Sequence, residues 1–504
     1  MSLRNYIKGV FINDKKCYCL FQGNMKIIIK NCLIVVLLIA LSVSAFHVRL
    51  NSFENSDKRS IDEFVYYNMA KQMVKDIVDY NTIPYGKELT ERGRPLPQYF
   101  FEPLFKHPPV FTLMAMLSMK AFGVKLVSAG YVSLFLSALM IPMIYLLGFL
   151  VYDKRTGLLA ALFLWMDPVS IMTSQKVWMD TSIAFFTLLA ALFFVLGLKK
   201  NDWFFILSAA ASGLAANTKY TGILITFTIF LFAITYRRDL FKNSKFNFSL
   251  VLPFLLLLPW LLWNFNVYGL ESVTDNAEIA GLIKRLAKAA KLIIPIGLLC
   301  AATFLLYKKI KRDISNSDEV EIATDRSEET QIKINSKLQQ ASFVLVFFIF
   351  CFLFRGYVIN SLRFDFIPFT TWQGGILSNE PAVFYFGRLI EYFLVYILAF
   401  VSLLVFQPNE KQISAFIRIS AVVILLFFIM WGNFQCRYIL SSIAFLILLA
   451  ANSVYKIFDL VAKIKHFSIR IVLLSAVSTF ITYSILKVIY LNLALSYTND
   501  MCYF

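Results

Sequence analysis

Two adjacent acids open the first polar stretch of an otherwise apolar chain. Asp62 and Glu63 follow Ser60, at the start of a segment, residues 60–109, rich in charged and aromatic-hydroxyl side chains. Carboxylates at the mouth of a membrane protein are candidate general bases, since a carboxylate within hydrogen-bonding distance of an acceptor can take its proton. Glu63 has a second interpretation, because Ser60 and Glu63 fit a capping box in which each side chain bonds the other's backbone N–H. Asp62 also suits the first turn of a helix, where the helix dipole favours an acid.

The spacing of apolar residues predicts the helix that would carry these acids. The residues that recur four apart are Ile61, Val65, Met69, Met73 and Ile77. They form one apolar stripe, with charged residues off it, as in a helix lying at the membrane interface. Residues 108–122 are apolar but short for a span, and they predict a second interfacial helix or re-entrant piece. Both belong to an expected outer loop, residues 47–125.

Composition indicates what surrounds this loop. The chain has 504 residues, of which 59% are hydrophobic and 16% charged. Together with repeated apolar runs of spanning length, this excludes a soluble domain and predicts a polytopic, all-α membrane protein. The net charge of +18 does not indicate a nucleic-acid partner, because the basic residues form short clusters between spans. That pattern is typical of the positive-inside rule.

The apolar runs and basic clusters predict about thirteen transmembrane helices. The first is expected at residues 25–45, and every dense basic cluster then falls on the inner side. The predicted organisation is a cytoplasmic segment 1–26, a membrane core 27–307, a cytoplasmic mobile loop 308–340, and C-terminal membrane helices 341–504 with an outer loop 355–388. Inside one expected span, Asp167 precedes Pro168, and its carboxylate is expected to accept hydrogen bonds where the proline breaks the backbone pattern.

Cysteine and histidine are too sparse or too scattered to build a metal centre. The chain has seven cysteines and three histidines. The cysteines lack paired spacing, so we expect neither a disulfide framework nor a metal cluster. The sequence therefore predicts no resident cofactor; a divalent cation is conceivable but not indicated.

The topology gathers a further set of polar residues on the outer side. They are Asp62, Glu63, Tyr66, Lys106, His107, Lys176, Asp180, Lys219, Asn264, Asn266, Arg363, Arg388, Arg437 and Tyr438. Ionisable groups at membrane depth cost about 2.5–3.5 kcal/mol each on insertion scales, so they usually mark function or pairing. Lys176 and Asp180 fit an i,i+4 ion pair at a helix end. Arg437 has two interpretations, an interfacial anchor or a planar donor that binds a phosphate.

Several short motifs, taken in order, resemble one superfamily. They are Asp62-Glu63 with Tyr66, the basic residue before Pro108-Pro109, Asp153-Lys154-Arg155 with the following Gly157-Leu158-Leu159-Ala160-Ala161-Leu162, Lys176 to Asp180, Gly213 to Lys219, Pro259-Trp260 to Asn264, and Arg437-Tyr438. This order over roughly residues 60–270 and 430–455 resembles lipid-linked-sugar glycosyltransferases of the GT-C fold. The nearest group in that fold contains the protein O-mannosyltransferases and the lipid A aminoarabinose transferase.

The resemblance implies transfer of a sugar from a polyprenyl phosphate to an acceptor, with inversion, on the outer face of the membrane. It implies that Asp62, with Glu63 beside it, supplies the general base. The implied substrate-binding residues are Tyr66, Lys106, His107, Asp180, Arg388, Arg437 and Tyr438, with the cations facing the leaving phosphate. The chain departs from the family pattern at His107, where relatives often carry lysine, and no histidines match the zinc site of the lipid A enzyme.

The implied partners are a polyprenyl-phosphate sugar donor, membrane lipids and an acceptor that is a lipid, glycan or protein. The expected location is the cytoplasmic membrane, or the endoplasmic reticulum in a eukaryote. The alternative from another class is a polytopic transporter or lipid flippase. Transporters tend to show internal repeats and broken helices at the midplane, and the sequence shows no clear repeat.

Overall fold

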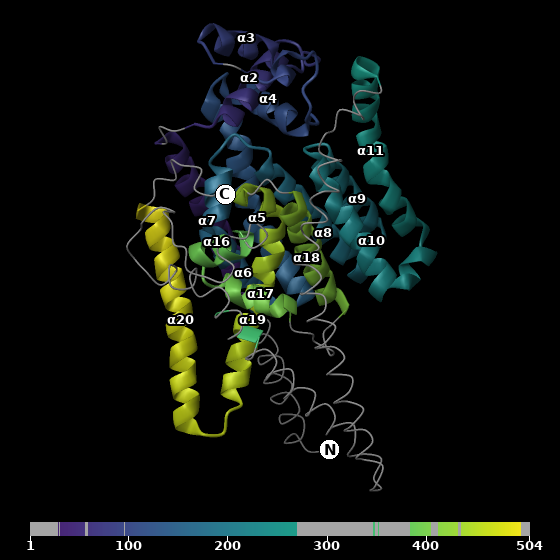
Figure 1. Ribbon diagram of the computed structural model, residues 1–504. Coiled ribbons are helices and arrows are strands. Elements are labelled where there is room, and N and C mark those ends of the chain that lie inside the picture. Colours follow the sequence, from purple (N-terminus) through teal and green to yellow (C-terminus); the bar gives the residue numbers. More distant parts are fainter. Residues whose placement is uncertain are drawn as a thin grey trace, which may run out of the picture.

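The computed structural model describes residues 29, 31–55, 59–94, 96–269, 346–347, 351, 384–404, 412–431 and 435–494. The predicted cytoplasmic segment 1–26, the predicted mobile loop 308–340 and most of the predicted outer loop 355–388 lie outside the described residues. Figure 1 shows the whole chain.

Regular structure in the described part is helical, as the sequence predicts. A helix Asn31–Glu54 comes first. It is followed by α2 Ile61–Lys75, α3 Ile83–Glu91, η1 Gln98–Phe101, α4 Val110–Phe122, α5 Leu126–Val151, α6 Lys154–Met166, α7 Pro168–Ser174, α8 Asp180–Lys199, α9 Trp203–Ala216, η2 Tyr220–Ile223, α10 Leu224–Tyr236, η3 Arg238–Lys242, α11 Ser244–Tyr268, α16 Phe384–Tyr392, α17 Tyr396–Leu404, α18 Gln412–Trp431, η6 Cys436–Ile439, α19 Leu440–Ala462 and α20 Phe467–Ala494.

Seven of these helices are long and apolar enough to cross a membrane, or eight if the bent pair α6 and α7 forms one span. This confirms a multi-pass membrane protein. The total of about thirteen spans stays a prediction, because part of the chain lies outside the described residues. The first helix begins at Asn31 and continues to Glu54, further along the chain than the predicted span 25–45. Its C-terminal half is thus helical where the outer loop was expected to begin.

The spans differ in how deeply they are enclosed. The most apolar window of the helix from Cys436 to Ala462 is 89% buried, whereas those of α20 and of Asn31–Glu54 are 17% buried. Figure 1 agrees: α19 runs through the bundle with α5, α6, α8, α17 and α18, and α20 lies at one flank. The enclosed helices can therefore hold fixed polar groups, and the flanking ones present apolar side chains outward.

Helices α2, α3 and α4 gather at one end of the bundle (Figure 1). The capping box predicted for α2 is present, with the Ser60 hydroxyl accepting from the Glu63 N–H and the Glu63 carboxylate accepting from the Ser60 N–H. Val65, Met69 and Met73 of the predicted stripe are at most 3% exposed. The helix ends at Lys75, so Ile77 falls outside it and is exposed. The short apolar segment 108–122 is observed as the helix α4, and its placement as an interfacial helix or a re-entrant piece stays a prediction.

The span predicted around Pro168 is broken there. The helix axis bends by 54° between α6 and α7. Asp167 caps α7 by accepting from the Ser170 N–H at 2.7 Å, and its second oxygen accepts from the Tyr396 hydroxyl at 2.7 Å. The predicted role of Asp167 as a hydrogen-bond acceptor is confirmed.

Two glycines permit close approach between helices near these features. A Cβ added at Gly157 would lie 2.5 Å from the Tyr145 carbonyl oxygen, so only glycine allows α6 to pack this closely on α5. A Cβ at Gly222 would lie 2.2 Å from the backbone of Ala215. η2 therefore folds back tightly against the end of α9, which places the intervening Lys219.

The expectation that the cysteines form no disulfide was wrong for Cys436, which is disulfide-bonded.

Candidate active site

The side chain of Asp62 meets a guanidinium from the far end of the chain. Asp62 lies in the first turn of α2, and its side chain is 47% exposed. Its Oδ2 atom accepts from Arg437 Nη2 at 2.8 Å. Arg437 comes from η6, is 8% exposed, and also donates through Nε to Gln435 Oε1 at 2.6 Å. This burial does not fit an interfacial anchor, whose head group reaches water.

A second acid and a lysine complete the charged cluster. Asp180, at the start of α8, pairs with Lys219 at 3.6 Å and lies 3.9 Å from Arg437 Nε. Lys219 Nζ lies 4.3 Å from the centre of the Tyr438 ring, and the Arg437 guanidinium carbon lies 5.3 Å from it. Two acids and two cations thus alternate in one small volume, with an aromatic face beneath the cations.

The local chain holds Lys219 in place. The Thr218 hydroxyl donates to the Leu214 carbonyl at 2.9 Å and the Lys219 N–H to the Ala215 carbonyl at 3.1 Å. Burial lowers the pKa of the Lys219 ammonium, and the nearby Asp180 carboxylate opposes that shift. Sequence reasoning placed Lys219 on the outer side but gave it no role. The Thr-Lys motif before a short helix is the signal that could have found it.

His107 and Lys106 lie next to this cluster but differ in burial and in charge. Burial lowers the pKa of His107 well below its usual value, and the charges of Lys219, Lys106 and Arg437 lower it further. The imidazole is therefore neutral at pH 7 and contributes no positive charge, whereas the exposed Lys106 ammonium does. The Tyr80 hydroxyl fixes this loop by donating to the His107 carbonyl at 2.9 Å.

Tyr66 closes the site on the α2 side. Its ring is 7% exposed and packs edge-on against Phe105 and Phe111. Burial raises the pKa of its hydroxyl, and the carboxylates of Asp62 and Asp180 raise it further. Tyr66 is therefore a neutral hydroxyl close to both acids.

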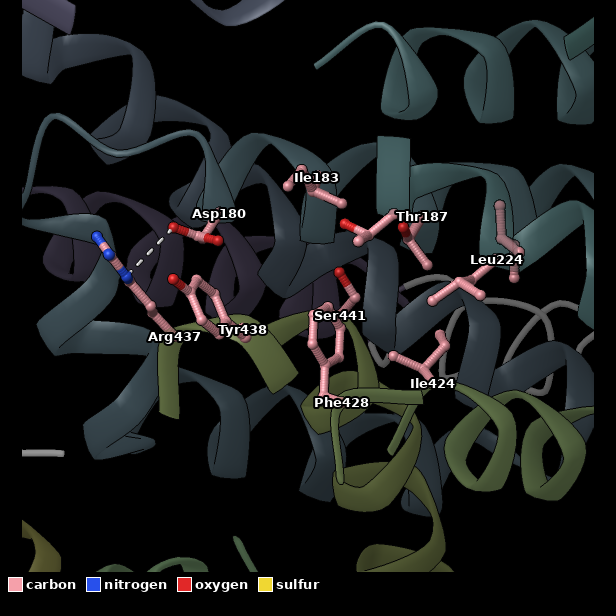
Figure 2. Close-up of a pocket in the computed structure, with 11 residues that line it drawn as sticks. Asp180, Ile183, Thr187, Leu224, Ile424, Phe428, Arg437, Tyr438 and Ser441 are labelled. Carbon is pink, nitrogen blue, oxygen red and sulfur yellow. Dashed lines mark ion pairs between the residues drawn. The ribbon is translucent and has the colours of Figure 1, made fainter. Parts of the chain in front are cut away.

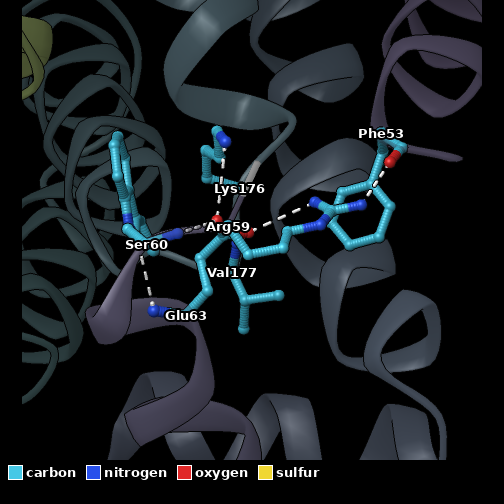
Figure 3. A network of polar contacts seen from close by, with 7 residues as sticks. Phe53, Arg59, Ser60, Glu63, Lys176 and Val177 are labelled. Atoms are coloured by element: carbon cyan, nitrogen blue, oxygen red, sulfur yellow. Dashed lines mark hydrogen bonds and ion pairs between the residues drawn. The ribbon is translucent and has the colours of Figure 1, made fainter. Parts of the chain in front are cut away.

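Glu63 faces away from Asp62, into the protein. It is fully buried, and its carboxylate contacts Arg59 at 3.3 Å, Lys176 at 3.5 Å and the Val177 N–H at 3.2 Å. Figure 3 shows this carboxylate between the two cations. Together with the capping bonds, these contacts leave no accessible oxygen for a substrate. The structure therefore favours the capping interpretation of Glu63 over a catalytic one.

The predicted ion pair between Lys176 and Asp180 was wrong. Lys176 pairs with Glu63, and Asp180 pairs with Lys219. The physical reason is that α8 begins only at Asp180. Lys176 therefore lies in the preceding turn and is not one helical turn away on the same face.

Residues 106–263 match the family model for dolichyl-phosphate-mannose-protein mannosyltransferase. That segment contains Lys106, His107, Asp180 and Lys219, and it excludes Asp62 and Arg437. No curated protein matches the sequence.

Solved structures match over nearly the whole chain. The crystal structure of ArnT from Cupriavidus metallidurans in the apo state aligns with 92% of this chain and 76% of its own, at 13% identity and a TM-score of 0.50. The oligosaccharyltransferase AglB from Archaeoglobus fulgidus, in complex with an inhibitory peptide and a dolichol-phosphate, aligns with 91% of this chain at 16% identity and a TM-score of 0.51. This chain spans 55% of the AglB chain.

The chain has the GT-C fold. The predicted resemblance to GT-C glycosyltransferases is thereby confirmed in sequence, over residues 106–263, and in architecture, over most of the chain. At these identities the solved structures establish the fold alone, so the chemistry must be argued from the side chains.

A narrow pocket leads from the charged cluster into the GT-C core. Asp180, Arg437 and Tyr438 line its polar end, and Ile183, Leu224, Ile225, Ile424 and Phe428 line its apolar walls, with Thr187, Thr221 and Ser441 between them. Figure 2 shows the polar residues at one side and Leu224 and Ile424 at the other. The pocket is small, and its lining changes from charged to apolar side chains along its length.

Arg388 lies on α16, at the end of the predicted loop 355–388. Its guanidinium pairs with Glu391 at 2.8 Å on the same helix. Its guanidinium carbon also lies 5.8 Å from the centre of the Phe384 ring, and its role in substrate binding stays a prediction. Among the other predicted substrate-binding residues, Asp180, Arg437 and Tyr438 belong to the charged cluster, Tyr66 and His107 lie within range of its charges, and Lys106 precedes His107 in the chain.

Proposed function

We propose that this protein is an integral-membrane glycosyltransferase that moves a sugar from a polyprenyl-phosphate donor to an acceptor on the outer face of the membrane. One observation carries the proposal. An accessible carboxylate, Asp62, pairs with Arg437 in a cluster that also holds Asp180 and Lys219, and Asp180 and Arg437 line a small pocket with apolar walls. An acid that takes a proton and cations that receive a phosphate are what this transfer needs at the reacting centre.

Asp62 is the general base in this proposal. Its side chain is about half exposed, so an acceptor hydroxyl or amine can approach it. As the acceptor atom bonds to the anomeric carbon, its proton passes to the Asp62 carboxylate. The bond from that carbon to the donor phosphate oxygen breaks, and its electron pair leaves with the polyprenyl phosphate. Attack from the face opposite the phosphate inverts the sugar, as in the resembling family.

Arg437 and Lys219 are the groups that receive the leaving phosphate. The charge on the phosphate oxygen grows during transfer, and preorganised cations in a buried site stabilise such charge most effectively. Arg437 can offer two parallel donors to a phosphate. It now bonds Asp62, so a bound phosphate competes for the guanidinium and frees the carboxylate for the acceptor. Lys106, exposed beside His107, is positioned to meet the head group first.

The donor class follows from the charges and from the relatives. AglB is described in complex with a dolichol-phosphate, and the matching family carries dolichyl-phosphate-mannose in its name. The cluster combines two acids with the cations Arg437, Lys219 and Lys106, which leaves about one positive charge for a single phosphate. We therefore assign the donor as a polyprenyl monophosphate sugar, acting at the outer face of the cytoplasmic membrane, or of the endoplasmic reticulum in a eukaryote.

We also propose that transfer needs no metal ion held by the protein. In the described part of the chain, no three His, Cys, Asp or Glu side chains group closely enough to hold one. Asp62 and Asp180 each face an arginine or lysine instead of a further acid, so their oxygens already have cationic partners. Transfer should therefore survive EDTA without loss. Activity that disappears in EDTA and returns with a divalent cation would contradict this part.

The decisive experiment uses the purified full chain in proteoliposomes. Donors are polyprenyl-phosphate sugars from the membranes of the source cell, and the product is followed by mass spectrometry. Deletion of the protein should cause one polyprenyl-phosphate sugar to accumulate, and that sugar should be consumed by the wild-type protein in vitro. No accumulation and no consumption, together with uptake of a solute, would refute transfer and favour a transporter.

A further inference from the structure

The turn before Asp180 is hydrogen-bonded to the start of α2. Glu63 and Ser60 form the capping box of α2, and the same two side chains receive the turn 176–178. Glu63 accepts from the Val177 N–H at 3.2 Å, and Ser60 Oγ accepts from the Trp178 indole N–H at 2.9 Å. The capping box therefore both caps the start of α2 and binds a second segment, 114–118 residues away in the chain.

The face of the same tryptophan holds the arginine of the site. The Arg437 guanidinium carbon lies 4.1 Å from the centre of the Trp178 ring. Trp178 is 2% exposed and Arg437 8%, so this cation–π contact is largely shielded from water. The opposite end of the turn is fixed as well, because the Ser133 hydroxyl on α5 donates to the Trp178 carbonyl at 3.2 Å.

These contacts close a ring around the candidate base. Ser60 bonds Trp178, Trp178 stacks on Arg437, Arg437 bonds Asp62, and Asp62 follows Ser60 by two residues in the same turn of α2. A closed ring of contacts restricts the guanidinium more than the single Asp62 bond does. When a phosphate displaces Asp62 from Arg437, the tryptophan face still keeps the guanidinium in place.

We infer that Trp178 is a positioning residue that holds Arg437 ready for the donor phosphate. It acts through Arg437 and does not itself touch the reacting atoms. The inference rests on the proposed function for the identity of the ligand. The ring of contacts itself is independent of that identity, and the experiment keeps the two apart.

The test compares Trp178→Leu and Trp178→Phe with a matched control. Trp165 also donates its indole N–H to a serine, Ser44 Oγ, at 2.9 Å, but it lies on α6 in the membrane core. Trp165→Leu therefore removes the same chemistry away from Arg437. Two quantities are measured on the full chain in nanodiscs: phenylglyoxal modification of Arg437, located by peptide mass spectrometry, and affinity for undecaprenyl phosphate.

Trp178→Leu should raise the modification rate of Arg437 and weaken phosphate binding by about 30-fold, the cost of a desolvated cation–π contact. Trp178→Phe keeps an aromatic face and should lie closer to the wild type in both measurements, which a purely space-filling role would not produce. Trp165→Leu should leave both unchanged. Equal Arg437 modification in Trp178→Leu, Trp178→Phe and the wild type would overturn the inference. Increased modification in a protein that binds no polyprenyl phosphate at all would support the ring and refute the proposed function.

Discussion

Replacement of Arg437 by lysine is the sharpest probe of the site. The substitution keeps the charge but removes the planar array of donors. In the structure the guanidinium bonds Asp62 through Nη2 at 2.8 Å, bonds Gln435 through Nε at 2.6 Å and stacks on Trp178. One ammonium cannot keep all three directions, so its geometry toward a phosphate is lost.

The expected magnitude follows from the interactions at stake. A hydrogen bond to a charged group contributes about 1.5–3 kcal/mol. Loss of one such bond to the donor phosphate corresponds to an affinity about 10- to 150-fold weaker. Membrane insertion and thermal stability should change less than donor affinity, because lysine retains the positive charge opposite Asp62.

The assay is donor saturation in proteoliposomes, with the polyprenyl-phosphate sugar varied and the acceptor held constant. Arg92→Lys is the matched control, because Arg92 also pairs with an acid, Glu88 at 2.7 Å, but both side chains are exposed at the C-terminal end of α3. Surface pairs of this kind contribute about 0–1 kcal/mol, so that variant should behave as the wild type. Wild-type donor affinity in Arg437→Lys would refute the bidentate role and leave Lys219 and Lys106 as the phosphate contacts.

Three further predictions test neighbouring residues. Asp62→Asn keeps the shape of the side chain and the Glu63 cap but cannot take a proton, so turnover should fall about 10²- to 10⁴-fold with unchanged expression; near-full turnover would remove Asp62 as the base. Glu63→Gln still caps α2 but leaves Lys176 and Arg59 without their carboxylate, so the melting temperature should drop, consistent with about 3–5 kcal/mol for a broken buried pair; a variant as stable as the wild type and with greatly reduced turnover would instead make Glu63 catalytic. His107 has a lowered pKa in the folded protein, so the unfolded chain binds its proton first as the pH falls through about 6.5, and the free energy of unfolding should decline below that pH by up to about 1.4 kcal/mol per pH unit. His107→Gln should flatten this decline in thermal melts from pH 7 to 5. An unchanged decline would assign it to other groups.

Local patterns in the sequence were enough to predict the elements that carry the site. The apolar run from about residue 126 to residue 151 predicts a span, and α5 covers these residues, because its ends are marked by loop residues and by the basic turn that follows. The capping box of α2 and the role of Asp167 as a hydrogen-bond acceptor were also predicted, since each depends on residues within four positions of one another, whereas the break of the span was not predicted. These features are local, and the physics of caps, prolines and apolar periodicity acts locally.

The pairing between those elements could not be predicted in the same way. Asp62 and Arg437 are 375 residues apart, and either acid of the site could have faced either cation as far as sequence spacing can tell. The predicted Lys176–Asp180 pair shows the difficulty, because it assumed a helix across both residues where α8 starts at the second. Because α8 starts at Asp180, Lys176 lies outside the helix and pairs with Glu63, and Asp180 pairs with Lys219.

The positions of the charged residues suggest why this arrangement suits a membrane protein. Asp62 and Asp180 each lie in the first turn of a helix; Lys219 precedes the short 3₁₀ segment η2 that leads into α10, and Arg437 lies in η6, which leads into the span α19. Helix N-termini carry partial positive charge, which stabilises the two acids, and each cation faces one of them. The charges therefore concentrate where helices begin, and the enclosed spans α8 and α19 remain apolar along most of their length. A phosphate that enters this cluster competes with Asp62 and Asp180 for Arg437 and Lys219. The helix N-termini still stabilise both carboxylates when the cations turn toward the phosphate.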